Sequence, residues 1–274
     1  MKEICGDNFG ENKLTIGNRV KYLLLNFFRG INGYRKRLKS KYWTPIKFIA
    51  NSSSPSRQYI DNFLMHKFPE IFPRKEIKVL DIGCGSGYVR EILNKLGYEV
   101  DYTGVDVYRH EQFDDFNRFC VKPRFIQSEI ENLDLDEKYD LIISISALEH
   151  IKDDKLAVEK SERLLNPGGV VIHIVPSFWA LFLYLWHGYR QYTPALINKL
   201  FANRDITAYR LGGFLSFGAH WALITIPEFF SSQNIRQTGF YKNYIYFSAK
   251  FDKFLPVGST IWAIVYKYGN NKNI

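Results

Sequence analysis

Apolar positions along the middle of the chain recur in two patterns, which predict strands and helices in alternation. Short apolar runs bounded by glycine, proline or charged residues have the length of buried strands; they cover residues 78–82, 102–106, 124–127, 139–145 and 170–175. Helical spacing separates them over residues 89–96 and 153–165, with a helix or loop over 111–119. This order predicts an α/β fold, a Rossmann-like doubly wound and mostly parallel sheet. Such a sheet binds its ligand beyond the carboxyl ends of its strands.

The flanking regions are less regular. Apolar residues at helical spacing over 20–31 lie among basic residues and predict an amphipathic basic helix. A second helix is predicted from Ser56 to Lys67, because Pro69 should interrupt it. The last apolar run, Ile261 to Tyr266, has strand composition and predicts an antiparallel C-terminal edge strand.

A glycine-rich turn carries the most informative chemistry. The strand Val79-Leu80-Asp81-Ile82 runs directly into Gly83-Cys84-Gly85-Ser86-Gly87, and a helix follows. Glycines there allow a tight turn and leave room for a ligand to approach backbone N–H groups. Asp106, at the end of the next strand, follows Gly87 by 19 positions, where a carboxylate accepts hydrogen bonds from the ribose of an adenosine. Tyr88 stands where a dinucleotide fingerprint requires a third glycine, which argues against NAD.

Five motifs in order resemble those of the class I S-adenosylmethionine-dependent methyltransferases, and residues 190–201 are similar to the members that act on small molecules and surface glycans. The motifs are Val79 to Gly87, Gly104-Val105-Asp106, Tyr139 to Ile142, Leu148-Glu149-His150-Ile151 and Leu165 to Gly169. The resemblance covers roughly residues 75–202 and implies S-adenosyl-L-methionine as the cofactor. It implies that Asp81, Gly83, Gly85 and Gly87 surround the methionine moiety, that Asp106 binds the ribose and that Val107 covers the adenine. It further implies that Glu129, which follows Ser128 where the family has a Gly-Asp pair, approaches the adenine amino group, and that Ser146 lines the methyl-transfer pocket.

Methyl transfer from a sulfonium needs mainly proximity and alignment, so a dedicated catalytic side chain is not obligatory. His150 is the candidate general base, because an imidazole titrates near neutral pH; its alternative role is to pack the following helix. We expect O-methylation of a small molecule or of a glycan or lipid intermediate. Two alternatives are an NAD-dependent oxidoreductase and a noncatalytic scaffold that retains the fold.

The positive charge is concentrated in one segment. The chain carries a formal net charge of +9, yet from residue 61 onward 25 basic residues balance 25 acidic ones. Residues 12–60 hold eleven basic residues and no acidic one. This segment is interpreted as a solvated charged face, an RNA-binding arm or an anchor on an anionic membrane surface, with Leu23, Leu24, Phe27 and Phe28 facing the lipid. A nucleic-acid partner is disfavoured, because the rest of the chain is neutral and contains no readable RNA-binding module.

These observations predict a basic N-terminal extension over residues 1–60 and a methyltransferase domain over 61–274, with a lid insertion around 176–250. Three widely separated cysteines without a CxxC pair support neither a disulfide framework nor a metal site. No signal peptide or stretch long enough to span a bilayer is readable. We therefore expect a cytoplasmic protein, peripheral on the inner membrane face if the extension binds lipid.

Overall fold

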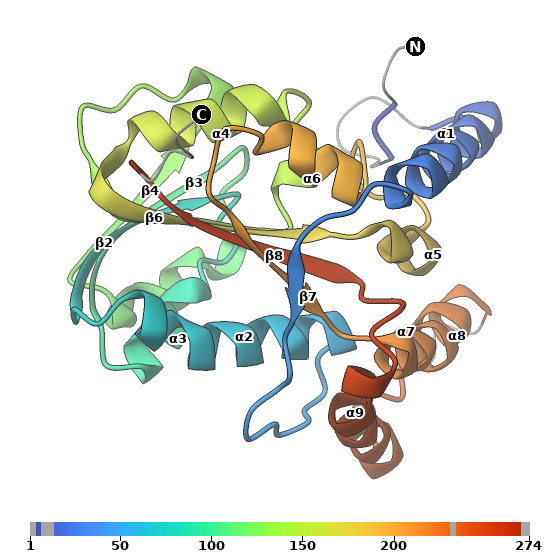
Figure 1. Cartoon of the computed structure of the whole chain (residues 1–274). Coiled ribbons are helices and arrows are strands. Elements are labelled where there is room, and N and C mark those ends of the chain that lie inside the picture. The colour runs from blue at the N-terminus through green and yellow to red at the C-terminus, as the bar shows by residue number, and fades with distance from the viewer. Residues whose placement is uncertain (1–3, 7–13, 231–233, 270–274) are drawn as a thin grey trace. The chain divides into compact units, whose positions relative to one another are not determined.

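The computed structural model describes residues 4–6, 14–230 and 234–269 (Figure 1). Within this part, eight strands join in one sheet in the order β1-β7-β8-β6-β5-β2-β3-β4. The strands are Ser40–Tyr42 (β1), Glu76–Ile82 (β2), Glu99–Asp106 (β3), Lys122–Gln127 (β4), Tyr139–Ile145 (β5), Leu165–Pro176 (β6), Thr207–Leu211 (β7) and Ile261–Lys267 (β8). The α-helices are Ile16–Tyr34 (α1), Pro55–Ile71 (α2), Val89–Lys95 (α3), Asp154–Arg163 (α4), Leu181–Tyr184 (α5), Pro194–Leu200 (α6), Phe214–His220 (α7), Ile226–Phe230 (α8) and Gly239–Phe251 (α9). The predicted strands and helices of the middle region are thereby confirmed.

Strands β2 to β6 form the parallel half of the sheet. β2 pairs in parallel with β3 and β5, and β3 with β4. The chain therefore moves outward from β2 to β4 and then returns across β2 to begin β5. This reversal makes the carboxyl ends of β2 and β5 a topological switch point, the position at which open α/β sheets bind ligands.

The C-terminal strand β8 is antiparallel, as predicted, but it is not the outermost strand. Tyr268 N–H donates to the Gly169 carbonyl and Ser177 N–H to the Thr260 carbonyl, both at 2.8 Å, so β6 and β8 run in opposite directions. β7 and β1 add beyond β8, and β1 pairs in parallel with β7. The edge position was wrong because the segments that supply β1 and β7 have no readable strand pattern.

The chain divides into two compact units. Unit 1 comprises residues 1–63, 175–199 and 208–263, and unit 2 comprises residues 64–174, 200–207 and 264–274. In unit 2, α3 lies on one face of the parallel strands and α4 on the other, which is the doubly wound arrangement (Figure 1). The strand interiors, such as Val79, Leu80, Leu141 and Ile142, are fully buried. Hydrophobic burial on both faces explains the nearly continuous apolar runs of these strands.

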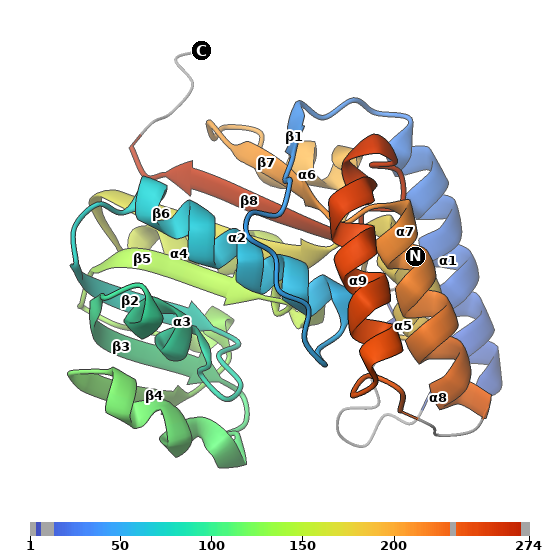
Figure 2. The ribbon, with the colours of Figure 1, turned by 90° about the horizontal axis from the view of Figure 1, so that it is seen from below.

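Unit 1 gathers the helices α1, α5, α7, α8 and α9 (Figure 2). Its N-terminal helix α1 begins after Thr15, whose hydroxyl oxygen accepts the Asn18 N–H at 3.3 Å. The helix buries Tyr22, Asn26, Gly30 and Gly33. A side chain at Gly30 would overlap the Phe178 ring, so the helix approaches the rest of unit 1 on its small-residue side. The aromatic stretch after β6 is core here, because Phe178, Leu181 and Leu183 are buried.

Helix α2 continues through Pro69 to Ile71, so the predicted interruption at this proline was wrong. Pro69 lies in the last turn, where its missing N–H removes only one hydrogen bond at the end of the helix. Phe68 and Phe72 are buried and stack at 5.5 Å, which holds this turn in place. No helix among the described residues is both long and apolar enough to cross a bilayer.

Candidate functional site

The glycine-rich turn after β2 folds back on the end of the neighbouring strand. The N–H groups of Gly83 and Cys84 both donate to the Val105 carbonyl, at 2.8 and 3.2 Å. Gly85 has a φ of +49°, and a Cβ placed on it would meet nothing within 4 Å. The backbone at Gly85 therefore borders open space, which is the condition for close approach of a ligand to the turn.

Asp106 is attached to this turn through its side chain. Its Oδ2 accepts the Gly85 N–H at 2.9 Å and its Oδ1 accepts the Tyr108 N–H at 3.3 Å. The carboxylate is half-buried at the end of β3. Each carboxylate oxygen can accept more than one hydrogen bond, so Asp106 retains capacity for two hydroxyl donors.

Asp81 lies deeper than the turn that follows it. The residue is 2% exposed, and its Oδ2 accepts the Tyr102 hydroxyl at 2.6 Å. Burial and the Asp81 charge raise the pKa of Tyr102 well above its usual value, so this hydroxyl remains a donor. Burial, followed by the charges of Asp81 and Asp106, likewise raises the pKa of Cys84 far above its usual range. Cys84 is therefore a buried thiol rather than a reactive thiolate.

The loop after β5 reaches the same edge of the sheet. Ile82 of β2 is in register with Val105 of β3 and with Ser144 of β5. Ser146 is exposed, adopts a φ of +51° and donates its N–H to the Ile174 carbonyl at 2.8 Å. A side chain at Gly83 would overlap Ala147, so this glycine is needed for the two loops to approach each other. The structure thus brings Gly83 and Ser146 to adjacent strand ends.

Val107 and Glu129 follow the ends of β3 and β4, which are also neighbours. Asp106 is in register with Gln127, whose Nε2 donates to the Val107 carbonyl at 3.1 Å. Val107 is 45% exposed. Glu129 is exposed, and its Oε2 accepts the Asn132 side-chain amide at 2.8 Å. Both residues therefore lie at the same edge of the sheet as Asp106.

His150 lies on the 3₁₀ turn Leu148–His150 that follows β5. Its side chain is 28% exposed, whereas the neighbouring Glu149 side chain is fully buried. The His150 Nε2 and Glu149 Oε1 atoms are 4.0 Å apart. The imidazole is therefore accessible and has a carboxylate beside it that can stabilise its protonated form.

Arg90 is the site residue that sequence reasoning missed. It is fully buried in α3, and its guanidinium donates to the carbonyls of Gly87, Ser86 and Phe113 at 3.0, 3.1 and 2.6 Å. The Nη1 donates to the Asn117 side-chain oxygen at 2.6 Å. Arg90 therefore holds the carbonyl side of the turn, which leaves the N–H side of Gly85 directed toward Asp106. The available signal was a cation among the apolar positions of the helix Val89–Lys95.

A model of a methyltransferase domain family matches residues 56–237, about two thirds of the chain. The chain belongs to the class I S-adenosylmethionine-dependent methyltransferases. It is therefore an enzyme whose cofactor is S-adenosyl-L-methionine, as the motifs predicted. The NAD-dependent oxidoreductase and the noncatalytic scaffold are not supported.

This methyltransferase is similar to curated enzymes named ubiquinone biosynthesis O-methyltransferase. The one from Azorhizobium caulinodans is 30% identical over 114 residues, which are 39% of this chain and 43% of that protein. The one from Yersinia pestis is 32% identical over 115 residues, which are 40% of this chain and 46% of that protein. The match thus spans less than half the length of these relatives, and their activity does not transfer to this chain by similarity alone.

Solved structures share the fold of this methyltransferase. The N-methyltransferase NodS from Bradyrhizobium japonicum, in complex with S-adenosylhomocysteine, aligns with a TM-score of 0.52 over 80% of this chain and 90% of its own, at 12% identity. A coclaurine N-methyltransferase bound to N-methylheliamine and S-adenosylhomocysteine aligns with a TM-score of 0.51 over 93% of this chain and 88% of its own, at 14% identity. At these identities the likeness establishes the fold and leaves the acceptor open.

Proposed function

We propose that this methyltransferase transfers the methyl group to a hydroxyl oxygen of a small-molecule acceptor. The observation that carries the site is the Asp106 carboxylate, which is held by the Gly85 N–H beside open space at the switch point of the sheet. Support for an oxygen acceptor comes from the names of the curated relatives, which are O-methyltransferases. A glycan or lipid intermediate with a free hydroxyl fits the same chemistry.

The cofactor would lie along the carboxyl ends of β2 to β5. Asp106 would accept hydrogen bonds from the two ribose hydroxyls, and Val107 would cover one face of the adenine while Glu129 approaches its amino group. Gly83, Gly85 and Gly87 would surround the methionine moiety. The buried charge of Asp81 would favour the positive amino and sulfonium groups nearby. Ser146 would line the pocket in which transfer takes place.

When bound, the cofactor would supply an electrophilic methyl group, so this chain would have to hold the acceptor oxygen in position to receive it. Transfer to a hydroxyl oxygen would require the acceptor to lose its proton. We assign His150 as the base that takes this proton, because its imidazole is accessible. The adjacent Glu149 carboxylate would stabilise the resulting imidazolium.

We also propose that unit 1 rests on an anionic membrane surface through α1. The outward side of this helix is apolar: Ile16, Val20, Leu24, Phe27, Phe28 and Ile31 are between 38% and 82% exposed. Leu23, expected on this face, is half-buried against the cluster of Tyr22 and Phe178, so that assignment was wrong. The helix presents apolar residues outward because its small residues occupy the inner side.

The charges around α1 suit anionic lipid. Lys21 and Arg29 on the helix and Arg35, Lys36 and Arg37 after it are exposed. Lys13 lies outside the described residues. Each basic side chain near an anionic bilayer contributes about 1 kcal/mol, and an aromatic residue that enters the interface adds its hydrophobic burial. This surface is consistent with a cytoplasmic enzyme that rests on the inner face of the membrane.

To test which atom is methylated, the purified chain is given isotope-labelled S-adenosylmethionine and one of two matched acceptors. The acceptors, catechol and 1,2-diaminobenzene, differ only in carrying hydroxyl groups or amino groups. We expect label on oxygen, found by mass spectrometry. Asp106→Ala should weaken S-adenosylhomocysteine binding about ten- to a hundredfold in calorimetry, because it removes charged hydrogen bonds. His150→Gln should lower kcat while leaving this affinity unchanged.

Asp115→Ala is the matched control, because Asp115 is an exposed carboxylate of the same unit. It should leave both binding and turnover unchanged. Transfer to the amine alone would overturn the oxygen assignment. An unchanged affinity in Asp106→Ala would overturn the ribose role of Asp106, whatever the acceptor.

A further inference from the structure

Beneath the glycine-rich turn of unit 2, a tyrosine is buried between a cation and an anion. Tyr102 of β3 is fully buried, and its hydroxyl donates to Asp81 Oδ2 at 2.6 Å. The Arg90 guanidinium lies over the Tyr102 ring, 4.7 Å from the ring centroid. Arg90 is fully buried as well, and Asp81 is 2% exposed. Tyr102 therefore contacts both charged side chains of this buried group at once.

The pairing of β2 with β3 explains why Tyr102 reaches Asp81. Val79 is in register with Tyr102, and Asp81 is in register with Gly104, which has no side chain. Tyr102 is thus a diagonal neighbour of Asp81 on the same face of the sheet, within the reach of an aromatic side chain. A Cβ at Gly104 would overlap the Cys84 Sγ atom, so the turn itself fills the space over this glycine. The position of the Tyr102 hydroxyl is therefore fixed by the strand register and by close packing.

A carboxylate at this depth keeps its negative charge only where hydrogen-bond donors or cations replace the lost water. The Tyr102 hydroxyl donates to the ionised form of Asp81 and therefore favours that form. Burial, followed by the Asp81 charge, raises the pKa of Tyr102 well above its usual value, so the proton stays on the phenol. The neighbouring Cys84 thiol also stays protonated, because burial raises its pKa. Asp81 is therefore the group of these three that can carry a negative charge.

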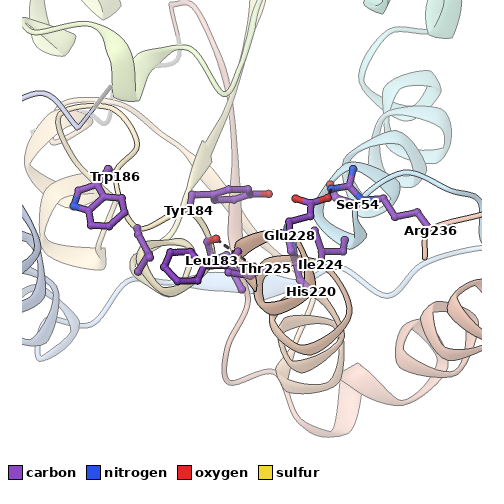
Figure 3. Close-up of a pocket in the computed structure, with 11 residues that line it drawn as sticks. Ser54, Leu183, Tyr184, Trp186, His220, Ile224, Thr225, Glu228 and Arg236 are labelled. Atoms are coloured by element: carbon purple, nitrogen blue, oxygen red, sulfur yellow. Dashed lines mark hydrogen bonds and ion pairs between the residues drawn. The ribbon is translucent and has the colours of Figure 1, made fainter. Parts of the chain in front are cut away.

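A pocket in unit 1 has a carboxylate in the opposite situation (Figure 3). This pocket has a volume of about 450 Å³ and is lined by residues of α5, by the segment from His220 to Phe229, and by Ser54 and Arg236. Among the described residues that line it, Glu228 is the only carboxylate; this side chain is exposed and forms an ion pair with Arg236. An exposed, paired carboxylate has little influence on the charge of a ligand. A buried carboxylate acts over several ångströms, without contact, because little water screens it.

We propose that Tyr102 is a positioning residue that keeps Asp81 ionised, and that this pair makes the site prefer a cationic methyl donor over the product of the transfer. S-adenosylmethionine carries a sulfonium and an ammonium group on its methionine moiety. S-adenosylhomocysteine, the product, carries the ammonium group alone, and 5′-methylthioadenosine carries neither. The buried Asp81 charge favours these compounds in that order. The inference rests on the proposed function, because it takes the methionine moiety to lie beside the glycine-rich turn.

The test measures the binding of these three compounds to the full chain by calorimetry. We expect Tyr102→Phe to weaken S-adenosylmethionine about tenfold, since a hydrogen bond to a charged group contributes roughly that factor or more. S-adenosylhomocysteine should be weakened by a smaller factor, and 5′-methylthioadenosine by less than about twofold. Retained binding of 5′-methylthioadenosine shows that the variant folds. Equal losses for the three compounds would overturn the inference, because a merely structural role does not depend on the charge of the ligand.

A double-mutant cycle tests whether Tyr102 acts through Asp81. Asp81→Asn keeps an oxygen that can accept the Tyr102 hydroxyl but removes the charge, so it should reproduce the graded loss. In the Asp81→Asn chain, Tyr102→Phe should weaken S-adenosylmethionine by less than about twofold further, because the charge that it supports is already gone. Losses that add in full would contradict a role through Asp81.

Two control variants remove comparable groups elsewhere. Tyr98→Phe deletes another buried hydroxyl of unit 2, which donates to the Phe72 carbonyl, and should leave the ratios of the three affinities unchanged. Glu228→Gln deletes the carboxylate of the unit 1 pocket and should leave these ratios unchanged too. A graded loss in either control would show that the preference for cationic compounds does not come from Tyr102 and Asp81.

A measurement on the native chain covers the case in which Tyr102→Phe fails to fold. In protein labelled with ¹³C at tyrosine Cζ, the Tyr102 resonance should shift when S-adenosylmethionine binds and much less when 5′-methylthioadenosine binds, because the cation polarises the hydrogen bond to Asp81. Equal shifts would refute the inference. A native chain that binds all three compounds but shows no graded loss in the variants refutes this inference alone, whereas one that binds none of them refutes the proposed function as well.

Discussion

The two units of this methyltransferase treat charge and hydrophobicity in opposite ways. Unit 2 buries a cation completely, because the Arg90 guanidinium satisfies the carbonyls of a glycine-rich turn. Unit 1 leaves the apolar side of α1 outward, with Leu24 and Phe28 53% and 60% exposed. In unit 2 the burial of a cation holds a glycine-rich turn in place, whereas in unit 1 an apolar face of the helix stays exposed. A buried cation and an exposed apolar face both depart from the usual placement of polar residues outside and apolar residues inside, and such departures often mark functional surfaces.

Each unit also contains one buried neutral histidine, and the two have different surroundings. His173 of β6 shares a hydrogen bond of 2.8 Å between its Nδ1 and the Ser144 hydroxyl, and its ring lies near Phe201 and Tyr266. His220 instead lines the pocket of unit 1. The same desolvation lowers both pKa values, but one imidazole belongs to a closed core and the other borders a cavity.

The largest loss of stability is expected when the buried cation of unit 2 is removed. Arg90→Leu leaves several buried carbonyls without their donor, so we expect a loss of about 3–5 kcal/mol in the free energy of unfolding. Urea denaturation measures this loss. S-adenosylhomocysteine affinity should fall as well, because the turn loses its anchor.

Arg109→Leu is the matched control, since Arg109 is an exposed arginine of the same unit whose guanidinium lies 5.0 Å from the Phe113 ring. It should cost less than about 1 kcal/mol. Similar losses for the two variants would show that Arg90 does not organise the turn.

The two buried histidines should make the free energy of unfolding depend on pH, an effect of intermediate size. Folded pKa values of about 4 for His220 and about 3 for His173 lie below the ~6.5 of an unfolded histidine. Below pH 6.5 the unfolded chain therefore binds protons that the folded chain does not, and stability falls as pH falls. The expected loss is about 1.4 kcal/mol per pH unit for each histidine, until its folded pKa is reached.

Urea denaturation at pH 6.5, 5.5 and 4.5 measures this slope. His220→Phe and His173→Phe should each remove one histidine's share, about 2 kcal/mol between pH 6.5 and 4.5. A slope that neither substitution changes would mean that these imidazoles are not the groups that bind the protons.

The smallest effect on stability is expected at the outward face of α1. Leu24→Ser combined with Phe28→Ser should change the free energy of unfolding by less than about 0.5 kcal/mol, because both side chains are already exposed. Co-sedimentation with vesicles that contain phosphatidylglycerol should nevertheless fall at least tenfold, since each apolar side chain contributes more than 1 kcal/mol on burial.

Phe240→Ser is the matched control, an exposed phenylalanine of unit 1 that lies outside α1. It should leave vesicle binding unchanged. Vesicles of phosphatidylcholine alone should bind the native chain weakly, because they lack the anionic charge. Unchanged co-sedimentation of the double variant would refute the membrane surface.

The parallel half of the sheet and the residues at its carboxyl edge could be predicted from the sequence. Strands that are buried on both faces appear in the sequence as continuous apolar runs. The glycine turn and Asp106 lie at fixed distances from the ends of these strands, so a local sequence pattern is enough to locate them. The roles of these residues toward the cofactor, and those of Glu129, Ser146 and His150, remain predictions, although the structure places them at neighbouring strand ends. Residues 214–230 have no single period, because a π-helical turn lies between two short helices there.

The sequence by itself determined the class of fold and the amphipathic character of α1, since both follow from local periodicity, and its resemblance to a known family indicated the cofactor. Only the tertiary structure decided which side of α1 faces outward, because the glycines that allow close packing compete with the apolar residues for the inner side. It alone showed that Arg90 is buried beneath the turn and that β8 lies inside the sheet. It also assembled the pocket around His220 from segments as distant as Ser54 and Arg236, contacts that no local pattern records.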